Sequence, residues 1–423
     1  MKKNLLLVLL LNAAALIGVE FEKEMNVQPP PPPAPWNALT GDWNGARTAA
    51  RDWGATITGQ YANDLLGNPI GGKAHGFANA GSFAVNLSLD LEKLLKARGL
   101  TLFTSAVVRH GNNLALKIGN QFPPAELYGT ETYVLNELYL KESLFDDWLQ
   151  LKAGRLDAGL DFLASLVYAN YVNNAFYGNP ISIFFNTPFH TFPNATWGAY
   201  FHFKPRKDLL FKFACYNNND KIFKNKYHGV NFTFDSPQGL LWITEWAYLL
   251  NQDGGLAGNY RVGAYYVTEV LQKFEGGTQK GNYGYYFLAD QMIYQNGDLN
   301  LVPWAALLFA PSNRNLFPFF MTAGLLLKGI VPSRKNDSIS FGVAYGAYSS
   351  ELRAVQRQAK MNGTLERFGN QPQTAETVLE LNYWLQINPW LALTPDLQYI
   401  INPKGFGTIQ NALVAGMQVI TNL

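Results

Sequence analysis

Cysteine, charge and long apolar runs are all scarce in this chain of 423 residues. Cys215 is the only cysteine, so no disulfide can form within the chain. Charged residues make up 15% of the sequence, well below the roughly 25% that is usual in soluble domains. The most apolar stretches, 301–310 and 317–327, are interrupted by Pro303 and Pro318 and fall short of the ~20 residues that a spanning helix requires. A disulfide scaffold and a bundle of membrane helices are therefore excluded.

Histidine is also rare, and its distribution argues against an enzyme. None of the five histidines lies in a Gly-x-Ser-x-Gly or His-Glu-x-x-His context, and no two have the spacing of metal ligands. We therefore expect no catalytic residues, no metal and no cofactor. The five are His75, His110, His190, His202 and His228.

The charge balance is close to neutral. The formal net charge is +2, and removal of Lys2 and Lys3 with an N-terminal leader would leave 31 basic and 31 acidic side chains. A neutral chain is a poor ligand for nucleic acid, and it gives no sign of a strongly ion-selective interior. This balance favours a neutral solute as the partner.

The N-terminus has the parts of an export signal. Met1–Asn4 is basic, Leu5–Leu11 is apolar, and Ala13–Ala15 offers small residues for cleavage. We predict a signal peptide over residues 1–20, with the cut either at the alanines or closer to Glu20. Residues 21–55 then form a periplasmic segment, in which Pro29–Pro33 is a stiff spacer or, alternatively, a partner-binding motif.

The dominant positive feature is strict alternation of apolar and polar residues. It runs through Phe83–Leu91, Thr377–Leu385 and Leu391–Ile401. Successive side chains of a strand point to opposite faces, so Leu87 and Leu381 should face lipid while Ser88 and Asn382 face water. In an exported chain with 14% aromatic residues, this pattern predicts an all-β fold. The expected architecture is a transmembrane antiparallel β-barrel over residues 56–423, preceded by a short periplasmic helix over 41–54.

The alternation gives seventeen candidate strands, but bacterial single-chain barrels close with an even number. We therefore predict 16 strands and expect one candidate to be wrong. Predicted short turns are 143–147, 205–207, 236–239 and 388–390, and predicted long loops are 110–132, 156–195, 271–282 and 350–375. The candidates are 56–63, 82–92, 100–109, 133–142, 148–155, 196–204, 208–216, 228–235, 240–250, 260–270, 283–294, 301–310, 319–329, 339–349, 376–387, 391–401 and 411–423.

The longest loop, 156–195, is rich in asparagine and aromatic residues, as in Tyr168–Phe176. A loop of this length is normally functional or disordered, and its aromatic content argues against disorder. We predict that it folds inward and narrows the lumen. A cap on the extracellular side is the alternative.

Five blocks along the chain resemble the carbohydrate-selective porins of the OprB family, in the family's order and over residues 36–423. The most specific is the last, in which a proline inside a strand is followed by Asp-x-Gln-Tyr. One departure is Leu423, where members of the family tend to end in an aromatic residue. The blocks are Leu39–Arg47, Ala153–Asp157 with Asp161-Phe162, Trp197-Gly198, Gly284–Gln291 and Leu393–Pro403.

The resemblance implies a barrel of 16 strands in the cell outer membrane that passes glucose-type sugars by diffusion. Its partners would be small neutral sugars, outer-membrane lipid and the barrel-assembly machinery, and association into a homo-oligomer is left open. A general size-limited porin, or a structural or adhesive surface barrel without sugar preference, is the alternative.

Sugar recognition in such a channel combines aromatic faces with charged or amide groups that bind hydroxyls weakly. The candidates lie on polar strand faces or at the roots of long loops. For each, a solvated lumen residue or a structural ion pair is the competing interpretation, and Trp197 fits a membrane girdle equally well. They are Arg109, Glu137, Arg155, Asp157, Asp161, Tyr177, Trp197, Glu245, Asp290, Glu380, Asp396 and Gln398.

Overall fold

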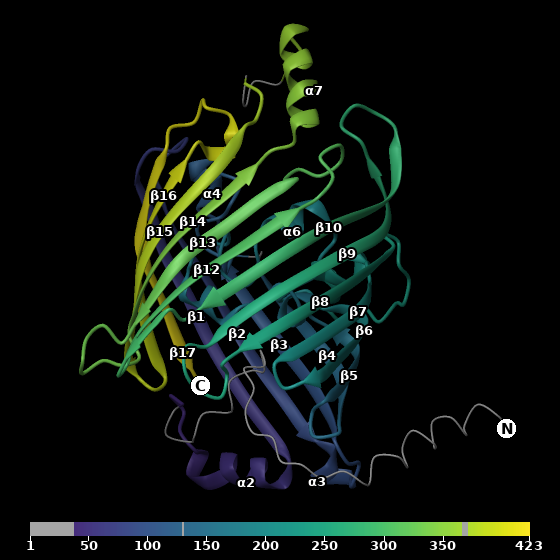
Figure 1. The fold of residues 1–423 in the computed structure, drawn as a ribbon, viewed down its shortest axis with the longest axis vertical. Coiled ribbons are helices and arrows are strands. Elements are labelled where there is room, and N and C mark those ends of the chain that lie inside the picture. Colours follow the sequence, from purple (N-terminus) through teal and green to yellow (C-terminus); the bar gives the residue numbers. More distant parts are fainter. Residues whose placement is uncertain (1–37, 129–130, 366–370) are drawn as a thin grey trace, which may run out of the picture.

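A computed structural model describes residues 38–128, 131–365 and 371–423. The predicted signal peptide and Pro29–Pro33 lie outside the described residues. The described chain forms a closed antiparallel β-barrel, with α2 (Ala46–Trp53) and the short α3 (Leu91–Leu95) below it and α7 (Ser350–Met361) above it in Figure 1. None of the helices in these ranges is long and apolar enough to cross a membrane.

Each strand pairs with its neighbour in the chain, and the last strand pairs with the first, which closes the barrel. The short β11 only extends the turn before β12, so the closed ring has 16 strands, as predicted. The strands are β1 (Ala55–Ile70), β2 (Gly76–Asp90), β3 (Leu100–Gly111), β4 (Thr132–Leu144), β5 (Leu149–Leu156), β6 (Thr196–Arg206), β7 (Leu209–Asn217), β8 (Leu240–Leu250), β9 (Gly258–Gln272), β10 (Thr278–Gln291), β11 (Tyr294–Asn296), β12 (Leu299–Phe309), β13 (Phe319–Lys328), β14 (Ser338–Ala347), β15 (Ala375–Asn388), β16 (Leu391–Ile401) and β17 (Ala412–Asn422).

The two ends of the barrel differ. The turn end carries α2 and the chain end at Leu423, whereas the opposite loop end carries the long connections and α7 (Figure 1). By the usual asymmetry of such barrels, the turn end corresponds to the periplasmic side. The helices are η3 (Trp43–Gly45), α2 (Ala46–Trp53), α3 (Leu91–Leu95), α4 (Ala115–Ile118), α5 (Ala158–Asp161), η4 (Leu166–Asn170), α6 (Ser182–Asn186), η5 (Asp220–Phe223), η6 (Asn225–Tyr227), α7 (Ser350–Met361) and η7 (Pro403–Gly405).

The candidate strand 228–235 was wrong. These residues belong to the connection 218–239, which approaches the wall through one backbone bond, from Leu135 N to the His228 carbonyl at 2.9 Å. Val230, Phe232 and Phe234 are exposed, and Phe232 and Phe234 pack against the Trp197 ring. The segment alternates because it lies in an extended form on the outer side of the barrel, without joining the sheet.

The predicted loop 271–282 is also mostly strand. β9 continues to Gln272 and β10 begins at Thr278, which leaves a tight turn between them. The sequence did not predict this part of the hairpin because it is polar on both faces, with Lys273 and Lys280 among its residues. Above the membrane, neither face of a hairpin needs apolar side chains. The other long predicted loops are present, although 350–375 contains α7.

Apolar and polar side chains lie on the outer and inner faces of the barrel as the alternation predicted. Leu381, Leu397 and Phe341 are 47%, 44% and 42% exposed on the outer face, where a soluble protein would place polar groups. Asn382 points inward, but it is only 3% exposed because a loop inside the barrel covers it. The prediction that Asn382 faces open water was therefore wrong.

The predicted N-terminal helix is present as α2, and it secures the seam between β1 and β17. Arg47 is buried and donates hydrogen bonds to the carbonyls of Gly41 at 3.1 Å, Ile57 at 3.2 Å and Leu423 at 2.5 Å. Its guanidinium also lies 4.9 Å from the centre of the Trp43 ring. One side chain thus joins the helix to the first strand and to the residue that follows the last strand.

We expect Leu381→Arg to destabilise the barrel by ~2–4 kcal/mol, because it places a charge in lipid near the middle of β15. Ser88→Arg, on the inner face of β2, should leave stability nearly unchanged. The measurement is the temperature at which the unboiled gel band converts to the unfolded form. Equal midpoints for the two variants would contradict the assignment of faces.

We expect Arg47→Ala to lower the same conversion temperature, since hydrogen bonds from a charged group contribute roughly 1.5–3 kcal/mol. Arg51→Ala on the same helix is the matched control, because the half-buried Arg51 forms an ion pair with its helix neighbour Asp52, at 3.9 Å, and not with a strand of the seam. An unchanged midpoint for Arg47→Ala would show that α2 does not secure the seam.

Candidate functional site

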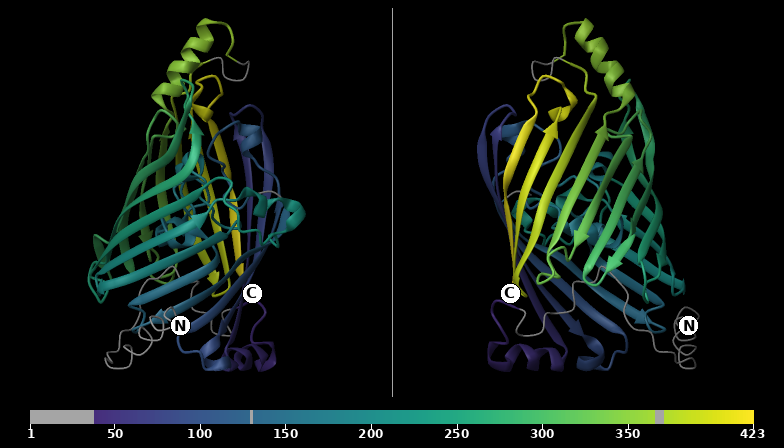
Figure 2. Two further views of the ribbon diagram at one scale, coloured as in Figure 1. Left: turned by 90° about the vertical axis from the view of Figure 1, so that its right-hand side faces the viewer. Right: turned by 60° about the vertical axis from the view of Figure 1, so that its left-hand side comes forward.

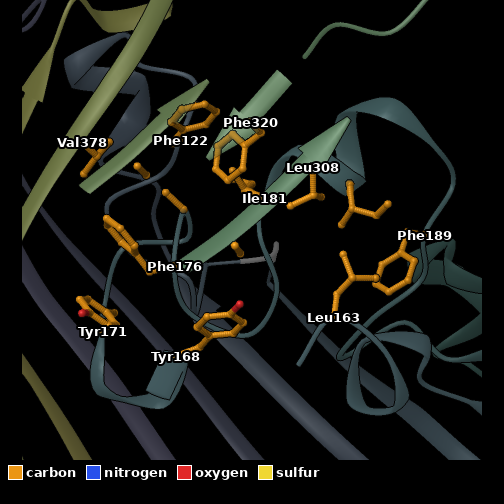
Figure 3. Packing of buried hydrophobic residues seen from close by; sticks show 14 of the residues in the cluster. Phe122, Leu163, Tyr168, Tyr171, Phe176, Ile181, Phe189, Leu308, Phe320 and Val378 are labelled. Atoms are coloured by element: carbon orange, nitrogen blue, oxygen red, sulfur yellow. The ribbon is translucent and has the colours of Figure 1, made fainter. Parts of the chain in front are cut away.

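The centre of the barrel is filled by the connection between β5 and β6, residues 157–195, hereafter the inserted loop. Its largest apolar side chains are buried inside the barrel, as Figure 3 shows for Tyr168, Tyr171 and Phe176. The predicted inward fold is therefore confirmed, and the extracellular cap is excluded.

The aromatic side chains of the inserted loop pack against β12, β13 and β14. Tyr171 stacks on Phe176 with ring centres 4.9 Å apart, and its hydroxyl accepts a hydrogen bond from Trp304 Nε1 at 2.9 Å. The same hydroxyl donates to the Phe341 carbonyl at 2.9 Å. A Cβ at Gly324 would lie 2.5 Å from this hydroxyl, so only glycine lets the ring approach the wall.

Acidic side chains of the wall bind the backbone of the inserted loop. Glu380 accepts the backbone N–H groups of Val172 at 2.7 Å and Asn173 at 3.1 Å. Glu245 accepts Leu163 N–H at 3.2 Å on the opposite side of the loop. Hydrogen bonds to charged groups contribute roughly 1.5–3 kcal/mol each, so these contacts fix the loop in the lumen.

A second connection, residues 112–131, packs onto the inserted loop and will be called the accessory loop. Glu376 accepts the N–H groups of Gln121 and Phe122, both at 2.8 Å. Gln398 joins the two loops, because it accepts from Asn173 Nδ2 at 2.8 Å and donates to the Pro124 carbonyl at 3.0 Å.

Sequence reasoning missed Glu376. The signal was available, since Glu376 lies four residues before Glu380 in one alternating strand and therefore on the same face.

The root of the inserted loop brings several predicted residues together. Asp157 accepts the first N–H groups of α5, from Gly159 at 2.8 Å and Leu160 at 3.2 Å, and Glu137 accepts the N–H of Asp157 at 3.3 Å. Asp161 forms an ion pair with Lys152 at 2.5 Å. These carboxylates hold the loop where it leaves the wall.

Four further candidates lie around the loop. Asp290 is half-buried and accepts from Ser165 Oγ at 3.1 Å and Asn259 Nδ2 at 2.6 Å. Arg109 lies 3.5 Å from Glu126 of the accessory loop. The remaining two are Asp396, which accepts from Gln398 Nε2 at 2.7 Å, and Tyr177, which is half-buried and borders a cavity at the turn end.

The other two predicted residues do not face the lumen. Arg155 and Trp197 are opposite each other on neighbouring strands and share the outer face. Arg155 is fully buried under the connection 218–239, where it donates to the Gly229 carbonyl at 2.7 Å and to the Ala195 carbonyl at 3.0 Å. The bulge of this connection on the outside of the barrel is visible in the left view of Figure 2.

The reason for this misplacement is the shortness of β5. β5 has only eight residues, so the upper part of β4 extends beyond it without a strand partner on that side. The connection 218–239 lies across this edge of β4. The alternation of β5 and β6 is regular, but sequence alone does not show that a later connection lies across the outside.

Within the described residues, no three His, Cys, Asp or Glu side chains are grouped so that they could hold a metal ion. The arrangement is instead that of a wide barrel restricted by two fixed loops. Such a structure can restrict passage by size and by weak contact with polar solutes.

Comparison with known proteins agrees with this geometry. The chain is 27% identical to Porin B of Pseudomonas aeruginosa over 417 residues, which cover 90% of each chain. It is 25% identical to the putative porin QuiX of Acinetobacter baylyi, with coverage of 91% of this chain and 92% of the relative.

Among solved structures, the high-pH structure of Pseudomonas putida OprB superposes with a TM-score of 0.86 at 24% identity, over 92% of this chain and 98% of the other. This match shows the common barrel fold. Residues 74–423 match the description of the carbohydrate-selective porins of the OprB family. The protein therefore belongs to the carbohydrate-selective porin family OprB, and it is an outer-membrane channel rather than an enzyme.

Proposed function

We propose that the protein is a passive diffusion channel that admits glucose-type neutral sugars to the periplasm. Membership in a carbohydrate-selective family supports sugars as the solute class. The near-neutral composition supports an uncharged solute. The choice of glucose-sized sugars rests on the restriction of the lumen by the inserted loop and the accessory loop, both of which are bonded to the wall.

One observation carries the proposal: the inserted loop is anchored on two sides of the lumen, by Glu380 on β15 and by Glu245 on β8. A loop held from one side could swing and would set only a loose size limit. A loop held from both sides presents the same groups to every solute, which selection by weak hydrogen bonding requires.

The predicted site residues divide into two roles in this proposal. Asp290 of the wall and Tyr177 of the inserted loop retain exposed surface and would contact the sugar directly. The other lumen candidates are buried and would act by positioning the inserted loop and the accessory loop. They are Arg109, Glu137, Asp157, Asp161, Glu245, Glu380, Asp396 and Gln398.

A general size-limited porin is the second candidate, and one observation favours it. The hydrogen-bonding groups of Glu245, Glu380 and Gln398 are occupied by loop atoms, which leaves fewer groups for a sugar. In that case the loops would set a diameter without a preference for sugars.

Liposome swelling separates the two candidates. Vesicles that contain the protein should swell faster in glucose than in a neutral amino acid of similar size, and slowly in a disaccharide. Equal rates for glucose and the amino acid would establish the general porin. Failure to swell in any of the three solutes would contradict both.

Removal of one anchor tests whether the inserted loop sets the restriction. Glu380→Ala leaves two buried N–H groups without an acceptor, at a cost of roughly 1–3 kcal/mol each, so the loop should detach from β15. We expect larger and noisier single-channel currents and loss of the difference between glucose and the amino acid.

Glu351→Ala is the matched control, because Glu351 is bonded to Ser312, Ser349 and Ser350 outside the barrel. Its currents should equal those of the wild type. Wild-type currents in Glu380→Ala would instead place the restriction elsewhere, with the accessory loop as the next candidate.

A further inference from the structure

A cavity at the turn end of the barrel shares Tyr177 with the candidate site and also contains Trp384, which has not been considered so far. We propose that it is a second sugar-contact site, in which a neutral pyranose stacks on the indole of Trp384. This inference rests on the proposed passage of sugars and adds a contact on the periplasmic side of the inserted loop.

The cavity has a volume of about 730 Å³, which lies within the range of small-molecule sites. Ala169 and Tyr177 of the inserted loop form its roof. Trp384 and Ile420 line the wall, and the turns after β13 and β15 form the rim. A solute that has passed the loop therefore enters this space before it reaches the periplasm.

Trp384 faces the lumen. It alternates with the outward Leu381 and Tyr383 positions and shares the inner face of β15 with Glu380 and Asn382. Indoles of such barrels usually lie in the outer girdles, as Trp242 and Trp246 do on the outer face here. The half-buried Trp384 ring packs in part against the apolar core and borders the cavity with the remainder.

The ring of Trp384 is held in one orientation. Its Nε1 donates to Gln386 Oε1 at 3.1 Å, and Gln386 Nε2 donates in turn to the Asn388 carbonyl at 2.6 Å. One edge of the indole is thus bonded to the protein, and the part of the half-buried ring that borders the cavity is the surface assigned to the ligand. A fixed ring loses little conformational freedom on binding.

The polar groups around the indole favour an uncharged ligand. Asp337 forms an ion pair with Arg334 at 2.5 Å and also accepts from Tyr383 at 2.7 Å, so its charge is compensated. The carboxamides of Gln60 and Asn422, hydrogen-bonded to each other at 3.1 Å, also line the cavity, and Lys335 is exposed at its rim. Carboxamides both donate to and accept from hydroxyl groups. An aromatic face beside carboxamides suits a neutral pyranose better than a sugar acid or an amino acid.

Fluorine NMR tests the contact directly. The full-length protein is labelled with 5-fluorotryptophan, which marks its ten indoles, and Trp384→Phe identifies the resonance of position 384. Glucose and a disaccharide should shift this resonance in a saturable way, whereas sorbitol, which has no pyranose ring, should not. Absence of a shift at saturating sugar would overturn the inference.

Planar bilayers test the side from which the site is reached. Sugar added on the periplasmic side should reduce the ion current at lower concentration than sugar added on the other side. Trp384→Leu should raise the periplasmic half-blocking concentration about fivefold, the factor that corresponds to about 1 kcal/mol, and Trp384→Phe should restore part of it.

Trp246→Leu, on the outer face of β8, is the matched control and should behave as the wild type. An unchanged half-blocking concentration in Trp384→Leu would overturn the inference.

Liposome swelling separates this result from failure of the proposed function. Glucose uptake with no response at Trp384 would contradict only the second site, and absence of glucose uptake would contradict the proposed function itself.

Discussion

The interior of this barrel depends on hydrogen bonds between wall carboxylates and the backbone of a loop. A connection of this length cannot enter a narrow lumen unless its buried N–H and carbonyl groups find partners, because each unsatisfied group costs free energy. Glu245 on β8 and Glu380 on β15 supply those partners for the inserted loop, and Glu376 on β15 supplies them for the accessory loop. These backbone N–H groups are not bonded within a helix or a sheet, so the carboxylates take the place of the usual carbonyl acceptors.

Aromatic side chains also hold the inserted loop against the wall. Tyr171, Phe176 and Trp304 form a cluster with edge-to-face and stacked contacts, which favours one arrangement of the rings over others. Gly324 and Gly342 leave room for Tyr171 and Phe176 against the sheet. The inserted loop is thus held to the wall both by hydrogen bonds to carboxylates and by a packed aromatic cluster.

The barrel could be predicted from the sequence because lipid and water impose a period of two on every strand that crosses the membrane. Leu381 and Asn382 follow that rule, and the strand boundaries near them are within a residue or two of the structure. The rule failed for 228–235, since a segment that lies along the outer surface meets the same two environments without joining the sheet.

The sequence predicted which residues face the lumen better than it predicted what those residues do. Glu245 and Glu380 were recognisable as inward carboxylates, but their partners are backbone N–H groups, which every residue has and no sequence pattern marks. Arg155 was placed in the lumen because nothing in the sequence shows that the connection 218–239 covers the edge left by the short β5.

The loop contact also changes the character of the strands that it covers. Leu308 and Ala306 are buried against the inserted loop, while Leu307 and Phe309 face outward, so β12 is apolar on both sides. β13 is similar, and this explains why 301–310 and 317–327 are the most apolar stretches of the chain. Before the barrel closes, such uncharged segments of high β-propensity are the ones most prone to aggregate.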